Sequence, residues 1–169
     1  RVLLTGTNKR QIDQLNEKIV EKNKKRYFTV DFTDGDSLTR FLRKLTPYKR
    51  IDVCINNAGI NRLNEIGNIK PKDWADMAAV NMSAPLFLTK RVADKMKRNK
   101  YGRIVNISSI WGSKSKSKRA LYSMTKTGLQ GLTTASAVEL GRYNILINAV
   151  SPGFVDTELT RNNLSQKEI

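Results

Sequence analysis

Short apolar runs alternate with longer amphipathic stretches along the chain. The short runs are rich in Val, Ile and Leu, which predicts strands; they are Val2–Thr5, Tyr27–Asp31, Ile51–Asn56, Arg103–Ser108 and Ile145–Val150. The longer stretches repeat apolar residues at helical spacing; they are Gln11–Asn23, Ser37–Leu45, Lys72–Val80, Leu86–Asn99 and Leu121–Gly141. Strands separated by helix-length segments predict an α/β fold with a parallel sheet and helices on both faces.

The composition excludes several kinds of chemistry. The chain has 169 residues and no histidine, which excludes a Ser-His-Asp or Cys-His catalytic arrangement. Cys54 is the only cysteine, so we expect no internal disulfide, no metal site and a buried thiol. No apolar run approaches the roughly 18 residues that a membrane span needs. A single thiol fits a reducing compartment, and we therefore expect a cytoplasmic protein.

Small and polar residues follow three of the predicted strands. Asn57-Ala58-Gly59 comes after the third strand, Ser108-Ser109 closes the fourth, and Ser151-Pro152-Gly153 comes after the fifth. Because ligands of open parallel sheets bind at the carboxyl ends of the strands, these segments predict a ligand crevice. A plain turn explains any one of them equally well.

Tyr122 and Lys126 lie one turn apart at the start of a predicted helix. An ammonium group beside a phenol favours the phenolate and lowers the pKa of the tyrosine, which suits acid/base work. An ordinary exposed helix pair is an equally good interpretation of these two residues alone. Ser109 precedes them by one loop, so the fold would bring hydroxyl, phenol and ammonium around one crevice.

Taken together, these motifs resemble the short-chain dehydrogenase/reductase family, and within it the 3-oxoacyl-[acyl-carrier-protein] reductase branch. The resemblance extends from Val2 to about Thr160 and is carried by Asn56-Asn57-Ala58-Gly59, Asn81, Val105–Ser109, Tyr122-x-x-x-Lys126, and Asn148–Gly153 with Thr157. It implies one Rossmann-like, doubly wound domain over residues 1–169. It also implies an NAD(P)-dependent enzyme of fatty acid biosynthesis that reduces the carbonyl of a 3-oxoacyl thioester by hydride transfer. A sugar or other alcohol dehydrogenase of the same family is the alternative.

The resemblance also implies roles for individual residues. Tyr122 would donate a proton to the carbonyl oxygen, and Ser109 would hydrogen-bond the same oxygen. Lys126 would lower the pKa of Tyr122 and bind the nicotinamide ribose, while Asn81 would hold a water linked to Lys126. Besides Tyr122 and Lys126, the implied cofactor contacts are Asp31, Phe32, Asn57, Ala58, Gly59, Pro152, Gly153, Val155 and Thr157.

The start of the chain departs from the family. The glycine-rich turn of the family is absent, because Thr5-Gly6 is followed by Thr7–Ile12 without further glycines. The spacing from Val2 to Asp31 fits the second to third strands of the family. We therefore expect the first strand and helix and the last strand to lie outside this sequence, and residues 2–5 not to pair with residues 51–55.

The cofactor preference rests on two cations. Lys9 and Arg10 follow the first predicted strand, where members of the family that prefer NAD carry an acidic residue. A 2′-phosphate would be favoured there, so we expect NADP, with NAD as the alternative. Lys9 and Arg10 can also be read as ordinary residues of a first helical turn.

The chain is strongly basic, with 31 Lys+Arg, 15 Asp+Glu and a formal net charge of +16. Solvated helix faces are the plainest reading of this charge. The loop Ser113–Arg119 lies between Ser109 and Tyr122, where Lys114, Lys116, Lys118 and Arg119 would steer an anionic small-molecule or carrier-bound carbonyl substrate.

Two further expectations concern partners. A non-catalytic module that binds nucleic acid is the alternative from another class, but aromatic residues make up only 7% and no recognition motif occurs. Helices 86–99 and 121–141 form the dimer face in the family, which implies a homodimer or homotetramer.

Overall fold

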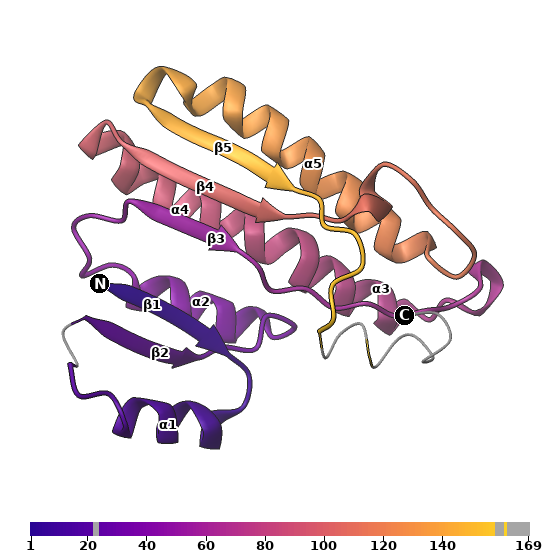
Figure 1. Ribbon diagram of the computed structural model, residues 1–169, viewed down its shortest axis with the longest axis horizontal. Helices are drawn as coiled ribbons and strands as arrows, with labels where there is room; N and C mark the ends of the chain where they lie inside the picture. The colour runs from indigo at the N-terminus through magenta and orange to yellow at the C-terminus, as the bar shows by residue number, and fades with distance from the viewer. Residues whose placement is uncertain (22–23, 158–160, 162–169) are drawn as a thin grey trace. The chain divides into compact units, whose positions relative to one another are not determined.

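The computed structural model describes residues 1–21, 24–157 and 161, which form two compact units that divide after Pro47 (Figure 1). The strands are β1 (Val2–Gly6), β2 (Lys25–Thr29), β3 (Val53–Asn56), β4 (Gly102–Ile107) and β5 (Ile145–Val150). The helices are α1 (Lys9–Glu17), α2 (Gly35–Lys44), α3 (Pro71–Ala78), α4 (Ala84–Asn99) and α5 (Ala120–Leu140). One domain over residues 1–169 stays a prediction.

The first unit is built on a two-stranded parallel sheet, with α1 connecting β1 to β2. Its core is aromatic: the ring of Phe41 on α2 lies 5.5 Å from that of Phe28 and 6.5 Å from that of Phe32, between centroids. Buried aromatic rings supply most of the apolar area of so small a core. Phe32, which the sequence placed at the cofactor, thus has its side chain in this core.

Helix α1 is shorter than predicted, and β2 begins earlier. The α-helix ends at Glu17 rather than Asn23; of that stretch, residues 22 and 23 lie outside the described part. The Asn16 amide explains the early end, because it accepts a hydrogen bond from Tyr27 N at 3.0 Å and donates one to Tyr27 O at 3.1 Å. These bonds tie the helix to the middle of β2. The strand starts at Lys25, whose ammonium lies over the Tyr27 ring at 4.9 Å.

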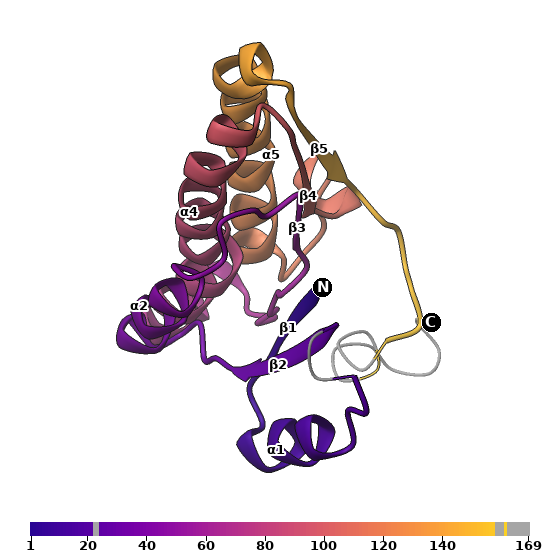
Figure 2. The same ribbon diagram turned by 90° about the vertical axis from the view of Figure 1, so that its left-hand side faces the viewer.

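The second unit is built on a parallel sheet in the order β3-β4-β5. Helices α4 and α5 lie on the same side of these strands (Figure 2), and their core includes Met96, Ile104 and Ile145, which are fully buried. On the opposite face of the sheet, Val53 and Ile55 are more than half exposed. Whether residues 2–5 pair with residues 51–55 stays a prediction, since these segments belong to different units.

A π-helical segment, Ala79–Ser83, joins α3 to α4. It was not predicted from the sequence, whose two helical stretches at this place were expected to be separate. Single π turns inside helices occur mostly at functional positions. This one carries Asn81, whose side chain is 1% exposed.

Two expectations from the composition concern the Cys54 thiol and membrane-spanning segments. The Cys54 thiol is largely enclosed, and its burial raises its pKa to about 11. Within the described ranges, none of the helices has the length and apolar character required to cross a bilayer.

Candidate active site

The carboxyl ends of β3, β4 and β5 meet at one edge of the second sheet (Figure 1). The chain stays hydrogen-bonded beyond the strands: Ser108 N donates to Val150 O at 2.8 Å, and Ile110 N donates to Pro152 O at 3.1 Å. These bonds hold together two of the three turns predicted to form a crevice, those after β4 and β5. The third turn follows the neighbouring strand β3.

Asn81 is held by both of its amide atoms. Its Oδ1 accepts from Ile60 N at 2.9 Å, and its Nδ2 donates to Ile60 O at 2.9 Å and to Thr125 Oγ1 at 3.1 Å. Thr125 Oγ1 in turn donates to Tyr122 O at 2.9 Å. The π-helical segment is thus tied both to the loop after β3 and to α5. Thr125 was not predicted as a site residue; its only sequence signal is its place beside Lys126.

Lys126 is buried at the end of β4. Its Nζ donates to Ile107 O at 2.8 Å, and Ser108 Oγ donates to Lys126 O at 3.1 Å. Burial lowers the pKa of Lys126 to about 8, since few groups replace the water that the ammonium loses. The side chain can therefore gain and lose a proton close to neutral pH.

Tyr122 and Ser109 lie together as predicted, and both are buried. Burial raises the pKa of Tyr122, while a side-chain hydrogen bond with Ser109 and the charge of Arg119 oppose this rise. The Lys126 Nζ lies 5.5 Å from the centre of the Tyr122 ring. The lowered pKa predicted for Tyr122 is therefore wrong for this structure, because desolvation of the phenolate outweighs the favourable contacts.

Arg119 is a correction to the sequence analysis. It was grouped with exposed lysines of a basic loop, yet its side chain is buried and lies over Trp111, 5.3 Å from guanidinium carbon to ring centre. Lys114, Lys116 and Lys118 are exposed, as the steering hypothesis requires. In the sequence Arg119 differs from these lysines in its place three residues before Tyr122, one helical turn away.

A buried polar chain lies beneath the site. Asn56 Nδ2 donates to Asn106 Oδ1 at 2.7 Å across the β3–β4 pair, and Asn106 Nδ2 donates to Thr133 Oγ1 on α5 at 2.9 Å. Asn56 Nδ2 also reaches Thr89 Oγ1 on α4 at 3.4 Å. Satisfied polar networks of this kind fix the register of the strands and helices that hold the site.

The predicted cofactor residues of the second unit border this site. A Cβ atom at Gly59 would lie 3.5 Å from Lys126 Nζ and 3.6 Å from Asn81 Oδ1, so a side chain at this position would contact both groups. Asn57 and Ala58 precede it and are exposed. Beyond β5, Pro152 is half-buried, while Gly153, Val155 and Thr157 are exposed.

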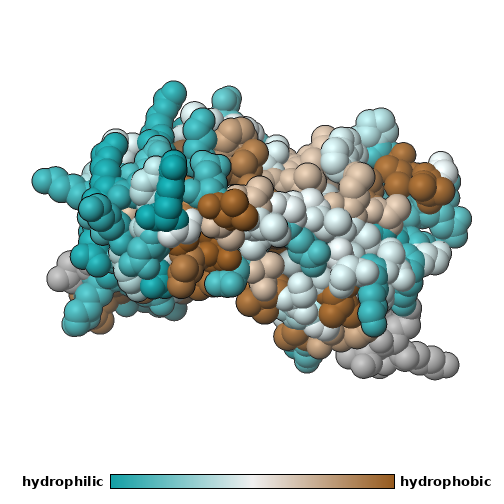
Figure 3. Space-filling view, turned by 90° about the horizontal axis from the view of Figure 1, so that it is seen from above, coloured by the Kyte–Doolittle hydropathy of each residue, from teal (hydrophilic) through white to brown (hydrophobic). Residues whose placement is uncertain are grey.

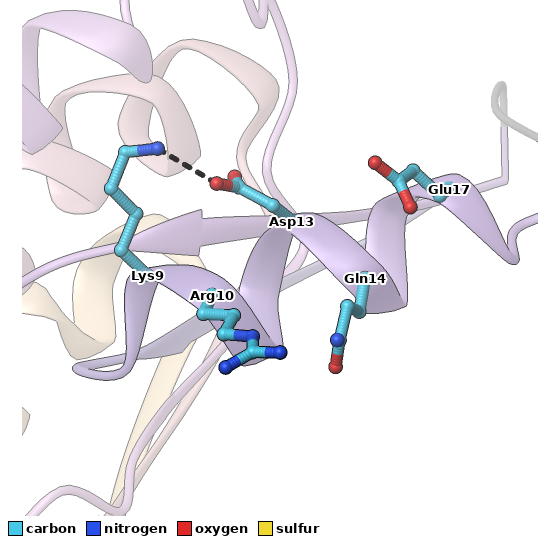
Figure 4. Close-up of a pocket in the computed structure, with 5 residues that line it drawn as sticks. All are labelled: Lys9, Arg10, Asp13, Gln14 and Glu17. Atoms are coloured by element: carbon cyan, nitrogen blue, oxygen red, sulfur yellow. Dashed lines mark hydrogen bonds and ion pairs between the residues drawn. The ribbon is translucent and has the colours of Figure 1, made fainter.

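The predicted cofactor residues of the first unit lie on its surface, apart from Phe32. Lys9 Nζ forms an exposed ion pair with Asp13 Oδ2 at 2.7 Å, which raises the pKa of Lys9. Figure 4 shows Lys9 turned toward Asp13 and Arg10 pointing away from that pair, beside an open depression of about 540 Å³. Asp31 Oδ1 accepts bonds from Thr33 N and Thr33 Oγ1 at 2.9 and 2.7 Å.

Comparisons with known proteins identify the fold and the family. A family model described as short chain dehydrogenase matches residues 1–168. The 3-oxoacyl-[acyl-carrier-protein] reductase FabG of Buchnera aphidicola is 35% identical over 80% of the chain, and that of Aquifex aeolicus is 33% identical over 94%. The chain spans 56% and 65% of the lengths of these two relatives.

A solved structure shows the same arrangement of elements. A gluconate 5-dehydrogenase from Burkholderia cenocepacia, in complex with NADP and tartrate, matches 95% of the chain and 64% of its own length, with a TM-score of 0.83 and 25% identity. The family and the Rossmann-like fold predicted from the motifs are confirmed. The chain belongs to the short-chain dehydrogenase/reductase family.

Proposed function

We propose that this protein is an NADP-dependent oxidoreductase that reduces a carbonyl group to an alcohol. The observation that carries the proposal is the convergence of Asn81, Ser109, Tyr122 and Lys126 at one edge of the sheet. These four residues come from the π-helical segment, the end of β4 and the start of α5. If their roles were only structural, they would not need to lie at the same edge of the sheet.

The residues present fit a nicotinamide cofactor. Gly59 carries no side chain that would contact Lys126 Nζ and Asn81 Oδ1, which suits close approach of a ligand to these two groups. Residues 57–59 and 152–157 would line the cofactor in the second unit, and the cofactor roles of Arg10 and Asp31 stay predictions from the sequence. When bound, the reduced cofactor supplies the hydride. NADP is favoured by Arg10 and by its presence in the B. cenocepacia structure; NAD is the alternative.

Tyr122 would supply the proton. Because burial raises its pKa, the phenol is protonated at neutral pH and is ready to donate. As the carbonyl carbon gains a hydride, its oxygen would develop alkoxide character and accept the phenolic proton, which gives the alcohol and a tyrosinate. Ser109, already within hydrogen-bond reach of the phenol, would donate to the same oxygen and stabilise its developing charge.

Lys126 would return the proton to Tyr122. With a pKa of about 8, its ammonium can release a proton without a large energetic cost and regain one from solvent. Asn81, whose side chain is fixed by Ile60 and Thr125, would hold a water linked to Lys126, as the resemblance to the family implies.

A 3-oxoacyl thioester is the favoured substrate. The two reductase relatives are named for this class, and a cleft of about 390 Å³ borders the basic loop, lined by Asn64, Glu65, Ile66, Ser115, Lys116, Ser117, Lys118 and Ala120. Exposed cations there would attract an acidic carrier protein or a thioester phosphate. A sugar or other alcohol is the alternative substrate within the family.

We also propose a homodimer or homotetramer that uses α4 and α5. Leu86 and Phe87 on α4 and Met124 and Val138 on α5 are between 43% and 83% exposed. Figure 3 shows apolar patches of this kind among hydrophilic side chains. Exposed apolar patches often mark interaction surfaces. Light scattering after size exclusion should give a mass of two or four chains, and a monomer would contradict this proposal. A cytoplasmic location stays a prediction.

The test is a turnover assay with matched tyrosine variants in the product of the complete open reading frame. We expect loss of the reduced-nicotinamide absorbance with acetoacetyl-CoA, and a fall of at least about 100-fold in kcat for Tyr122→Phe. The control is Tyr101→Phe, which removes a hydroxyl from a half-buried ring stacked on Arg103 at 4.4 Å. Equal activity of the two variants would refute the proton-donor role.

The same assay separates the alternatives. Turnover of gluconate or a simple alcohol, with none of the thioester, would favour a sugar or alcohol dehydrogenase. Salt-sensitive retention on DNA without any turnover would favour a nucleic-acid-binding module instead.

A further inference from the structure

We propose that Arg119 is a positioning residue for proton transfer by Tyr122, acting as a permanent positive charge beside the phenol. The proposal rests on the proposed function, because it assumes that Tyr122 transfers the proton. It adds a residue that lies outside the family motifs on which the resemblance was built.

The first observation is where the guanidinium lies. Arg119 caps the amino end of α5, and Ser123 N donates to Arg119 O at 2.8 Å, so Arg119 stands one helical turn before Tyr122. Its residue is only 4% exposed, whereas Lys118, next to it in the chain, is exposed and lies 3.8 Å from Glu65 Oε1. Burial of a cation is costly unless nearby groups stabilise it.

The second observation is what orients the guanidinium. It lies over the face of Trp111, and Trp111 packs against the cluster formed by Met77, Leu121 and Tyr122. The indole thus holds the Arg119 side chain against the same cluster that encloses the phenol. Contact with an aromatic face stabilises a partly dehydrated guanidinium.

The third observation concerns the charges around Tyr122. The hydrophobic residues packed with Tyr122 from the loop after β3, α3 and the turn after β4 are Ile60, Ile69, Met77 and Trp111. Two cations lie near Tyr122: Arg119, at the N-cap of α5, and Lys126, whose Nζ is 5.5 Å from the centre of the Tyr122 ring. Arg119 lowers the pKa of Tyr122, against the larger effect of burial.

The two cations differ in how they respond to pH. Because burial lowers the pKa of Lys126 to about 8, its charge is lost in the mildly alkaline range. A guanidinium stays charged throughout that range. Arg119 therefore maintains the field at the phenol while Lys126 changes its protonation, as a proton relay requires.

The experiment compares Arg119→Gln, Arg119→Lys and a matched control in the product of the complete open reading frame. The control is Arg142→Gln, at the other end of α5, where an exposed guanidinium lies over the Tyr143 ring at 4.9 Å. The readout is the pH profile of cofactor-dependent alcohol oxidation, in which Tyr122 must be ionised. For Arg119→Gln the acid limb should move to higher pH, with a loss of about tenfold in rate at neutral pH.

Arg119→Lys should keep the limb close to its original position, because it retains a charge, and Arg142→Gln should leave the profile unchanged. A lower rate with an unmoved limb in Arg119→Gln would show a merely structural role and overturn the proposal. If Arg119→Gln does not fold, Arg119→Met serves as the uncharged variant. The proposal is then overturned if the acid limb of the Arg119→Lys profile lies at the same pH as that of Arg119→Met.

A direct titration separates this proposal from the proposed function. The tyrosinate absorbance of Tyr122 is obtained by subtracting the titration of Tyr122→Phe, and it needs no turnover. Its midpoint should rise in Arg119→Gln, and a midpoint that stays in place overturns the role of Arg119. If Tyr122→Phe keeps full activity, the proposed function fails, whereas the midpoint still decides whether Arg119 acts on the phenol.

Discussion

Replacement of Lys126 by methionine should stabilise the fold at neutral pH while it removes a residue that the proposed reaction needs. Lys126 is 3% exposed, and burial lowers its pKa to about 8 from the ordinary value of 10.5. That difference corresponds to roughly 3 kcal/mol by which burial of the charge destabilises the fold. Lys126→Met removes this cost with a side chain of similar length.

The substitution also removes a hydrogen bond. Lys126 Nζ donates to Ile107 O at 2.8 Å, and a bond from a charged donor contributes roughly 2 kcal/mol. The net gain at pH 7 is therefore about 1 kcal/mol in the free energy of unfolding. A gain in stability with a loss of activity is the pattern expected of a functional residue kept at an energetic disadvantage.

The pH dependence gives the sharper test. A lysine with a lowered folded-state pKa binds protons more weakly in the folded than in the unfolded chain, so stability rises with pH between about 8 and 10.5. Lys126→Met lacks this rise. Its advantage at pH 7 should therefore shrink by about 3 kcal/mol through this window and become a disadvantage of about 2 kcal/mol near its upper end.

The assay is urea unfolding followed by circular dichroism at several pH values for the parent chain and Lys126→Met. Lys90→Met is the matched control, since Lys90 is exposed on α4. Groups that titrate in both chains cancel in the difference between them. A difference that stays constant from pH 7 to pH 10 would refute the claim that Lys126 is buried as a charge.

Two other predictions concern packing and steering. Gly102→Ala should lower the free energy of unfolding by about 1–3 kcal/mol, because its Cβ would overlap Met96 Sδ and lie 2.7 Å from Met96 Cγ in the core. Gly131→Ala is the control and should not destabilise the fold, because a Cβ there would have no atom within 4 Å. Equal effects of the two substitutions in thermal unfolding would contradict this prediction. Replacing the three lysines of loop 113–119 by serine should raise KM several-fold for a carrier-bound substrate and leave a small neutral ketone unaffected; equal effects on both substrates would count against steering.

The residues that the sequence predicted well are those whose environment is set by local pattern. Strand β5 has its predicted bounds, and α5 has its predicted bounds to within one residue, because apolar periodicity decides both. Ser109 and Tyr122 meet because parallel strands place their carboxyl ends at one edge. The spacing along the chain was therefore sufficient to predict that these two side chains share a site.

What the sequence could not predict depends on contacts between distant segments. Asn16 ends α1 by bonding to Tyr27, eleven residues away, and no local pattern shows that the amide will turn inward. Arg119 follows three exposed lysines, and only the position of Trp111 reveals that it is buried. The direction of the pKa shift of Tyr122 was also predicted wrongly. The spacing of Tyr122 and Lys126 along the helix indicates a nearby charge, but it does not show how deeply the phenol is buried.

The π-helical segment between α3 and α4 has a consequence for insertions and deletions. One residue in an α-helix corresponds to a rotation of about 100°. Asn81 faces Ile60, whereas Val92 and Met96, further along the chain, face the sheet. The wide turn at Ala79–Ser83 sets the rotation about the helix axis between these two directions. Losing a single residue there would leave either the amide or the apolar stripe facing the wrong way, so the length of this stretch is under tighter constraint than the identity of most of its side chains.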